Sequence, residues 1–273
     1  MPIARAAFYL ATIGAFALVL RSVMLGPVPV PIAAGAMVAY VALILVGVFT
    51  LRLRMFVDAV LEGPEDARGV ALSFDDGPHP EHTRKILDLL DAADVKATFF
   101  VVGHKAKLLP DVVKEIAERG HAIGIHSYAH DRLMSLMTPK AAARDLQLAL
   151  DAVESATGER PYMFRPPVGH TSPRLAEAIK KTRLAVVGWS ARGYDGLGSA
   201  NPEKVATRVE RDLRDGAIVL LHDAAERDDH DPVAIQALPR ILATMKERGL
   251  RAVRLDAWVG KPEEPVAHPR LAS

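Results

Sequence analysis

The chain has 273 residues, a formal net charge of +1 and no cysteine. The nearly balanced charge, without a dense run of Lys and Arg, argues against a nucleic-acid-binding protein. The lack of cysteine excludes disulfides and thiolate metal ligands, so any metal ion would have to be held by His, Asp or Glu.

Residues 1–55 are predicted to form a membrane anchor of two helices. Residues 6–25 and 32–51 are apolar apart from Arg21, and a helix of about 20 apolar residues crosses a bilayer. The prolines of Gly-Pro-Val-Pro-Val-Pro between them predict the bend of a transmembrane hairpin. A signal peptide is the alternative for the first stretch. We favour two spans, because no small-residue cleavage pattern follows it and a second apolar stretch comes directly after.

The arginines around this anchor bear on its orientation and hence on the location of the protein. Arg5, Arg52 and Arg54 flank the outer ends of the hairpin, and only Arg21 lies near the bend. The positive-inside rule therefore mildly favours both ends in the cytoplasm, which leaves the side of the rest of the chain unresolved. The expected location is the cell membrane, with residues 56–69 as a linker that contains Gly-Pro-Glu-Asp.

From residue 70 the sequence alternates between strand and helix patterns. Seven short apolar runs are predicted to be strands: 70–72, 97–102, 122–125, 162–164, 185–189, 217–221 and 251–255. Four helices are predicted to open with a capping residue followed by proline, at 138–139, 172–173, 201–202 and 231–232. The alternation predicts an α/β fold, a barrel of seven parallel strands over residues 70–260, followed by a flexible tail at 261–273.

Two adjacent carboxylates follow the first of these strands, in Ser-Phe-Asp-Asp-Gly-Pro at residues 73–78. Because side chains alternate along a strand, Asp75 and Asp76 are expected to point to different sides and can hold separate roles. Taken alone, a pair of acids before Gly-Pro is as well explained by a solvated turn. Catalytic groups of such barrels, however, gather at the carboxyl ends of the strands.

His126 and His130 follow the strand at 122–125. Their four-residue interval places two imidazoles on one face of a helical turn, a spacing typical of metal ligands, although a solvated surface pair is the alternative. With Asp76 they make a set that suits Zn²⁺ or another divalent ion and leaves positions open for water.

Two further strand ends carry candidate residues. Arg165 lies in Phe-Arg-Pro-Pro-Val-Gly at 164–169, where the prolines stiffen the chain. It can pair with a carboxylate and lower its pKa, or it is a surface arginine in a rigid loop. His222 ends the strand at 217–221, and is either a hydrogen-bonded rim residue or a catalyst.

Together these motifs resemble those of the polysaccharide deacetylases of carbohydrate esterase family four, the NodB-homology domain. The resemblance rests on residues 73–78, 126–130, 165–169, 189–195 and 220–223, in that order, and spans about residues 70–256. It implies a distorted (β/α) barrel. It also implies a metal-dependent hydrolase that removes N-acetyl groups from a sugar in a polysaccharide, peptidoglycan or chitin-like oligomer.

The resemblance implies a role for each matching residue. Asp75 corresponds to the general base and His222 to the general acid. The metal ligands correspond to Asp76, His126 and His130, with Zn²⁺ as the expected ion. The resemblance further implies that Arg165 pairs with the base and that Asp195 tunes the catalytic histidine. It also implies that the Val168 amide stabilises the oxyanion and that Leu220 and Pro166 contact the substrate.

Gly196 departs from the family pattern, in which tryptophan frequently follows the acid that matches Asp195 and lines the acyl pocket. The acyl group and the shape of the substrate therefore stay open. One alternative is a deacylase or deformylase of a lipid-linked amino sugar at the membrane surface, and another is a catalytically weakened carbohydrate-binding protein. The expected partners are an N-acetylated carbohydrate or glycolipid and the membrane, with neither nucleic acid nor an obligate protein partner.

Overall fold

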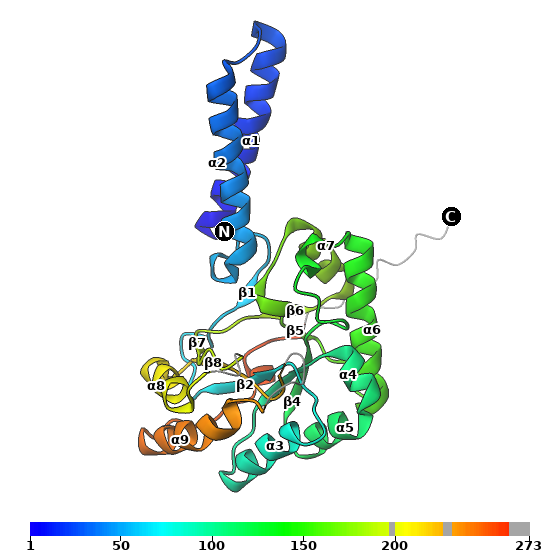
Figure 1. Ribbon diagram of the computed structural model, residues 1–273, viewed down its shortest axis with the longest axis vertical. Coiled ribbons are helices and arrows are strands. Elements are labelled where there is room, and N and C mark those ends of the chain that lie inside the picture. Colours follow the sequence, from blue (N-terminus) through cyan, green and yellow to red (C-terminus); the bar gives the residue numbers. More distant parts are fainter. Residues whose placement is uncertain (197–199, 226–230, 262–273) are drawn as a thin grey trace, which may run out of the picture.

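The computed structural model describes residues 1–196, 200–225 and 231–261, and shows a long helical hairpin standing on an α/β domain (Figure 1). The hairpin consists of α1 (Ile3–Leu25) and α2 (Val30–Phe49), which coincide closely with the two apolar stretches of the sequence. Both helices are long and apolar enough to cross a membrane. No residue of α1 is buried by the described part of the chain, so its apolar surface is left uncovered.

The domain is built on one sheet of eight parallel strands in the order β1-β6-β5-β4-β3-β2-β8-β7. The strands are β1 (Ala59–Val60), β2 (Ala71–Asp75), β3 (Thr98–Val101), β4 (Ala122–Ile125), β5 (Met163–Phe164), β6 (Ala185–Val187), β7 (Ala191–Arg192) and β8 (Ile218–His222). Only three residues separate β6 from β7, although the two strands lie near opposite ends of the order. The sheet must therefore curl back on itself, and it forms a distorted half-barrel of the predicted (β/α) type.

Helices cover the outside of this sheet (Figure 1). They are α3 (His82–Ala92), α4 (Gly103–Leu108), α5 (Pro110–Glu118), α6 (Pro139–Thr157), α7 (Pro173–Thr182), α8 (Pro202–Asp212) and α9 (Ala234–Glu247). Three predicted caps are confirmed, because the side chains of Thr138, Ser172 and Asn201 each accept a hydrogen bond from a backbone amide of the first turn. The fourth differs. Asp231 instead contacts His82 Nε2 at 2.9 Å, and α9 begins three residues later.

Six of the seven predicted strands are confirmed, and the differences concern three short segments. The run at 251–255 forms only a single bridge, from Ala252 to Val70, before the chain turns into a 3₁₀ helix, η4 (Leu255–Ala257). Residues 56–69 are not a bare linker, because they contain β1, which pairs with β6. The sequence also missed β7, since two residues are too few for an alternating pattern. The tail predicted at 261–273 lies, beyond Lys261, outside the described residues.

The central strands are buried on both faces, as parallel strands covered by helices must be. All five residues of β2 are buried, and the rings of Phe74 and Phe99 stack with centroids 5.1 Å apart. A buried strand gives a rigid support for the residues that follow it. The carboxyl ends of β2, β4, β5 and β8 share one edge of the sheet, and the predicted site residues lie there.

Candidate active site

Asp76, His126 and His130 come together beyond the ends of β2 and β4. One potential ligand atom from each residue lies within 4.8 Å of those of the other two. Asp76 Oδ1 is 3.1 Å from His130 Nε2 and 3.5 Å from His126 Nε2. The structure thus brings together the three residues that the sequence nominated as ligands, which we call the metal triad.

The two histidines do not lie on a helical turn, contrary to the expectation from their spacing. The segment is an irregular loop in which Ser127 and His130 have positive φ angles of 64° and 51°. Asp145 of α6 holds this loop, because its carboxylate accepts hydrogen bonds from the amides of Tyr128 at 2.7 Å and Ala129 at 3.1 Å. The imidazoles still approach each other, with ring centroids 4.9 Å apart.

The donor atoms of the metal triad fit a divalent cation. The Nδ1 of His126 lies 2.7 Å from the carbonyl oxygen of Arg165, which fixes the Nδ1–H tautomer and leaves the Nε2 lone pair directed at Asp76. Burial lowers the pKa of His126, which favours the neutral form that a ligand requires. Asp76 Oδ1 is buried, yet it accepts no hydrogen bond of regular geometry from the described residues. A bound cation would satisfy this oxygen.

The charges around Asp76 favour its ionised form. Burial alone would raise its pKa, but the close His130 imidazole, with the charges of His222 and His126, holds the pKa of Asp76 well below its usual range. The residue has a positive φ angle of 75°, which turns its side chain away from the line of β2. This backbone turn after the end of β2, rather than alternation along the strand, sets the direction of Asp76, and both Asp75 and Asp76 have a carboxylate oxygen within 4 Å of His126 Nε2.

Asp75 ends β2 and forms a buried ion pair with Arg165. The Nη1 of Arg165 donates to Asp75 Oδ1 at 2.7 Å and lies 2.9 Å from Ser73 Oγ. The other carboxylate oxygen, Oδ2, lies 3.8 Å from His126 Nε2 and so faces the metal triad. Arg165 is completely buried, which excludes the alternative of a surface arginine. One oxygen of Asp75 is thus anchored, and the other is directed toward the place where a substrate would react.

His222 ends β8 and pairs with Asp195. One carboxylate oxygen of Asp195 lies 3.1 Å from His222 Nδ1, and the other accepts a hydrogen bond from the His222 backbone amide at 2.8 Å. Burial by itself would lower the pKa of His222, but the charge and hydrogen bond of Asp195, together with the charges of Asp76 and Asp75, outweigh it and raise this pKa to about 10. His222 therefore carries a proton at neutral pH, and its side chain remains 21% exposed, so it can reach a substrate.

Gly196 lies directly against the His222 ring. A Cβ at this position would approach His222 Cε1 to 3.2 Å, which is tighter than ordinary contact. The chain can therefore pass beside the imidazole because residue 196 has no side chain. The wall that tryptophan supplies in many family members is absent at this position.

The remaining predicted residues lie around the same edge. Val168 has a positive φ of 51° in the 3₁₀ helix η3 (Pro167–Gly169), and its side chain points outward with 44% exposure. Pro166 and Leu220 are buried, with Leu220 only 7% exposed in β8. Of these three, Val168 offers the most accessible side chain for contact with a ligand.

Sequence reasoning missed Asp223 as part of this arrangement. Its buried carboxylate accepts hydrogen bonds from the Gly77 amide at 3.1 Å and from Thr83 Oγ1 at 2.5 Å, and it leaves no room for a Cβ at Gly77. Burial raises the pKa of Asp223 to about 7, and the nearby charge of Asp76 adds to the effect. Asp223 thus braces the turn that carries Asp76. The sequence could have suggested Asp223 as a site residue, because it directly follows His222.

Comparison with known proteins shows the family and the fold of the chain. The family model for polysaccharide deacetylase matches residues 62–187. A peptidoglycan-N-acetylglucosamine deacetylase of Bacillus cereus is 32% identical over 202 residues, which cover 74% of this chain and 72% of the relative.

Two solved structures share the fold. The peptidoglycan N-acetylglucosamine deacetylase Bc1960 is 30% identical with a TM-score of 0.68, and the match covers 74% of this chain and 94% of that one. A family 4 acetyl xylan esterase from Clostridium thermocellum, in complex with a cobalt ion, is 34% identical with a TM-score of 0.64. That match covers 69% of this chain and 89% of the esterase.

Proposed function

The chain belongs to the polysaccharide deacetylase family, and we propose that it is a membrane-anchored, metal-dependent hydrolase that removes the N-acetyl group from an amino sugar. The deacetylases among its relatives hydrolyse carbon–nitrogen bonds of N-acetylated sugars, and the use of a divalent metal is general for the family. The observation that carries the proposal is the meeting, at one edge of the sheet, of the metal triad with an anchored carboxylate, Asp75, and a protonated imidazole, His222.

Amide hydrolysis needs help at the carbonyl, at the attacking water and at the leaving amine. The metal triad would hold one divalent ion, for which we propose Zn²⁺, and that ion supplies Lewis-acid chemistry when bound. Three protein ligands leave coordination positions open, as catalytic sites require.

The proton transfers fall to two side chains of this chain. Asp75 Oδ2, which is not engaged by Arg165, accepts the proton of the attacking water as general base. His222, kept protonated by Asp195, donates a proton to the departing amine as general acid. The Val168 amide is the proposed hydrogen-bond donor to the developing oxyanion.

Two observations support membrane anchoring. The helices α1 and α2 are about 35 Å and 30 Å long, which matches the hydrocarbon core of a bilayer, about 30 Å. The ion pair of Arg5 with Asp58, at 2.8 Å, ties the start of α1 to the segment after α2, so both ends of the hairpin lie beside the domain. A signal sequence near the amino terminus is the alternative for α1.

The test is hydrolysis by the full chain, purified in detergent, with N-acetylglucosamine oligomers derived from peptidoglycan and from chitin. We expect acetate release, and we expect Asp76→Asn and His126→Ala to lose bound Zn²⁺ in elemental analysis and to lower kcat/KM by at least about a hundredfold. Asp88→Asn, an exposed acid on α3, is the matched control and should retain metal and activity.

Three outcomes would decide against parts of this proposal. Full activity in either triad variant would exclude the metal site. Formate release from an N-formyl sugar without acetate release from the N-acetyl sugar would favour the deformylase alternative. Glycan binding without release of either acid would favour a carbohydrate-binding protein.

A further inference from the structure

The end of the hairpin packs against the catalytic edge of the sheet. The Thr171 amide donates to the carbonyl oxygen of Val48 at 3.1 Å, and the Phe49 ring meets the His170 ring edge-on at 4.8 Å. His170 and Thr171 directly follow η3, the turn that carries Val168. The last turn of α2 therefore lies beside the candidate active site rather than at the opposite end of the domain.

A cavity of about 360 Å³ lies between these two parts of the molecule. Phe49, Leu51 and Arg52 contribute to it from the end of the hairpin, and Val168, Trp189 and Tyr194 contribute from the catalytic edge. The Trp189 ring is 5.9 Å from the guanidinium carbon of Arg165, the partner of Asp75. Tyr194 immediately precedes Asp195, the partner of His222. The cavity thus adjoins the supports of both proton-transferring residues.

The cavity has an excess of positive charge. Arg52, Arg192, Arg211 and Asp212 line it. Asp212 is 3.1 Å from Arg211, so these two side chains neutralise each other. Among the charged residues that line the cavity, this leaves the two positive charges of Arg52 and Arg192.

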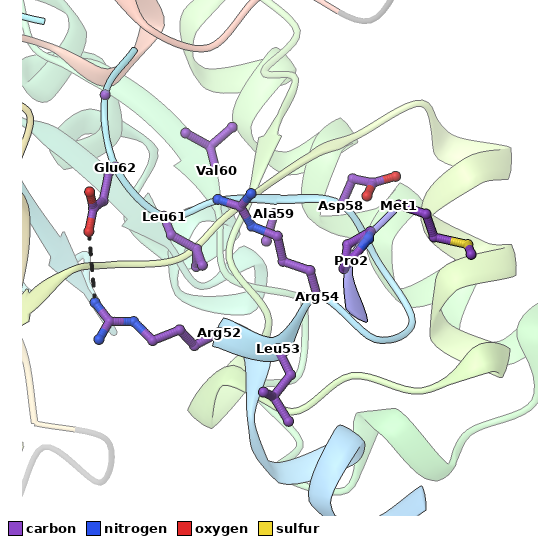
Figure 2. A pocket seen from close by; sticks show the side chains of 11 residues that line it. Met1, Pro2, Arg52, Leu53, Arg54, Asp58, Ala59, Val60, Leu61 and Glu62 are labelled. Atoms are coloured by element: carbon purple, nitrogen blue, oxygen red, sulfur yellow. Dashed lines mark ion pairs between the residues drawn. The ribbon is translucent and has the colours of Figure 1, made fainter. Parts of the chain in front are cut away.

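The described carboxylates compensate these two arginines only in part, because Arg52 shares its partner and none of them pairs with Arg192. Arg52 forms a long ion pair with Glu62, at 3.9 Å (Figure 2). The same Glu62 oxygen also accepts a hydrogen bond from Arg214 at 2.8 Å, so one carboxylate faces two guanidinium groups. Arg192 stacks on the Tyr194 ring at 4.0 Å and donates to its hydroxyl at 2.7 Å, which positions the guanidinium without neutralising it. A guanidinium that is held in place, as Arg192 is, and that has no carboxylate partner among the described residues is well suited to bind an oxyanion such as phosphate. Arg52 adds a second positive charge that the shared Glu62 offsets only in part.

The apolar residues of the cavity continue into the hairpin. Phe49 is the last residue of α2 and is 60% exposed, so a hydrocarbon chain that lies along the hairpin would reach the cavity at this ring. An uncharged polymer in water would gain little from two arginines beside an apolar helix end. An amino sugar joined through a phosphate to a lipid matches the charges and the apolar surface together.

We propose that this cavity binds the phosphate of a lipid-linked N-acylated amino sugar, with the lipid along the hairpin and the sugar directed past Val168 to the catalytic residues. The inference rests on the proposed deacylase function and narrows its substrate class. Arg52 and Arg192 are the phosphate ligands in this arrangement.

The test measures acetate release by the full chain in lipid nanodiscs. Four substrates carry the same sugar: N-acetylglucosamine joined through phosphate to a short polyprenol, an uncharged alkyl glycoside, lipid-free N-acetylglucosamine 1-phosphate, and a chitin tetramer. We expect kcat/KM to be at least about tenfold higher for the lipid phosphate than for the alkyl glycoside, since each arginine–phosphate contact is a charge-assisted hydrogen bond. The double substitution R52Q/R192Q should reduce that ratio at least about tenfold.

Arg68→Gln is the matched control, because Arg68 is 75% exposed and pairs with Asp215 near the amino end of β2, so the ratio should stay as in the wild type. Thermal unfolding by circular dichroism verifies that each variant is folded. A wild-type ratio near one, or a ratio that R52Q/R192Q leaves in place, would overturn the phosphate site. Equal turnover of the lipid-free sugar phosphate would overturn the role of the lipid. Failure of the proposed function is distinct, because the wild type would then release acetate from none of the four substrates.

Discussion

At the scale of single residues, Arg165 connects the proposed general base to the strands around it. Its guanidinium donates to Asp75 on β2 and to the carbonyl oxygen of Gly188 at 2.9 Å, and it lies 4.1 Å from the ring of Phe100 on β3. Its own carbonyl orients His126. Burial lowers the pKa of Arg165, and the charge of Asp75 opposes this effect. A buried pair of this kind is costly to break, because the remaining charge would be left unpaired.

The pairing of His222 with Asp195 makes a prediction about pH. His222 must be protonated to act as an acid, and Asp195, with the charges of Asp76 and Asp75, raises its pKa to about 10, so the wild-type kcat/KM should fall only above about pH 9. Without the Asp195 charge, only the charges of Asp76 and Asp75 oppose the effect of burial, so the pKa of His222 should fall. In Asp195→Asn the alkaline fall of kcat/KM should therefore shift by more than one unit toward lower pH.

The measurement is the pH dependence of kcat/KM for acetate release, from about pH 5.5 to 10.5, with Asp88→Asn as the control. The variant should lose most activity near pH 9 and retain more of it near pH 6. An alkaline limb that stays in place in Asp195→Asn would mean that Asp195 does not set the protonation of the general acid.

At the scale of elements, the segment after the hairpin belongs to the folded domain. Residues 59–60 form the edge strand β1, and the Gly188 amide donates to the carbonyl oxygen of Val60 at 2.8 Å. Leu61 is buried, and both Leu51 and Leu61 lie close to the Cα of Gly188, where they leave little room for a Cβ. Gly188 in turn accepts the hydrogen bond from Arg165. The segment thus packs against the backbone that holds the partner of the general base.

This packing predicts a measurable stability. Leu61→Ala should lower the free energy of unfolding by about 2–3 kcal/mol, because it removes a buried side chain and leaves a cavity. Leu108→Ala is the matched control, since Leu108 is 75% exposed and its loss should cost less than about 0.5 kcal/mol. Urea unfolding followed by tryptophan fluorescence compares the two. If residues 56–69 were only a linker, both substitutions would be equally harmless.

At the scale of the whole molecule, the hairpin projects from the side of the domain where β1 and β6 lie (Figure 1). Its end contacts His170 and Thr171, which follow η3 at the edge of the candidate active site. Its helices contact each other through the Thr12 and Tyr40 hydroxyls, 2.9 Å apart, while most of their apolar side chains stay exposed. If the hairpin spans a bilayer, the catalytic residues lie close to the membrane surface. This arrangement favours substrates attached to the membrane.

Membrane topology can be tested on single-cysteine variants, because the native chain has no cysteine. A membrane-impermeant maleimide should label Pro27→Cys in the bend and Glu159→Cys in the domain from opposite sides. The arginine distribution predicts that Glu159→Cys lies on the cytoplasmic side. Labelling of both variants from the same side, or loss of residues 1–25 from the mature protein in mass spectrometry, would contradict a two-span anchor.

The sequence by itself determined the strands that carry the site residues and most of the set that meets there. Apolar runs that end in Asp75, His126, Arg165 and His222 could be recognised locally, and the carboxyl ends of parallel strands necessarily share one edge. The caps at Thr138, Ser172 and Asn201 were equally readable, because a cap depends on neighbouring residues only. The site could be predicted to this extent because its geometry follows from strand direction.

Only the tertiary structure decided the features that depend on distant parts of the chain. The strands β1 and β7 exist because a neighbour offers hydrogen bonds, and Asp223 braces the turn that carries Asp76 because folding buries its carboxylate against the Gly77 amide. The irregular loop of His126 and His130 depends on Asp145 from another helix. The contact of Phe49 with His170 joins segments that are more than a hundred residues apart in the chain, and no local pattern encodes such a contact.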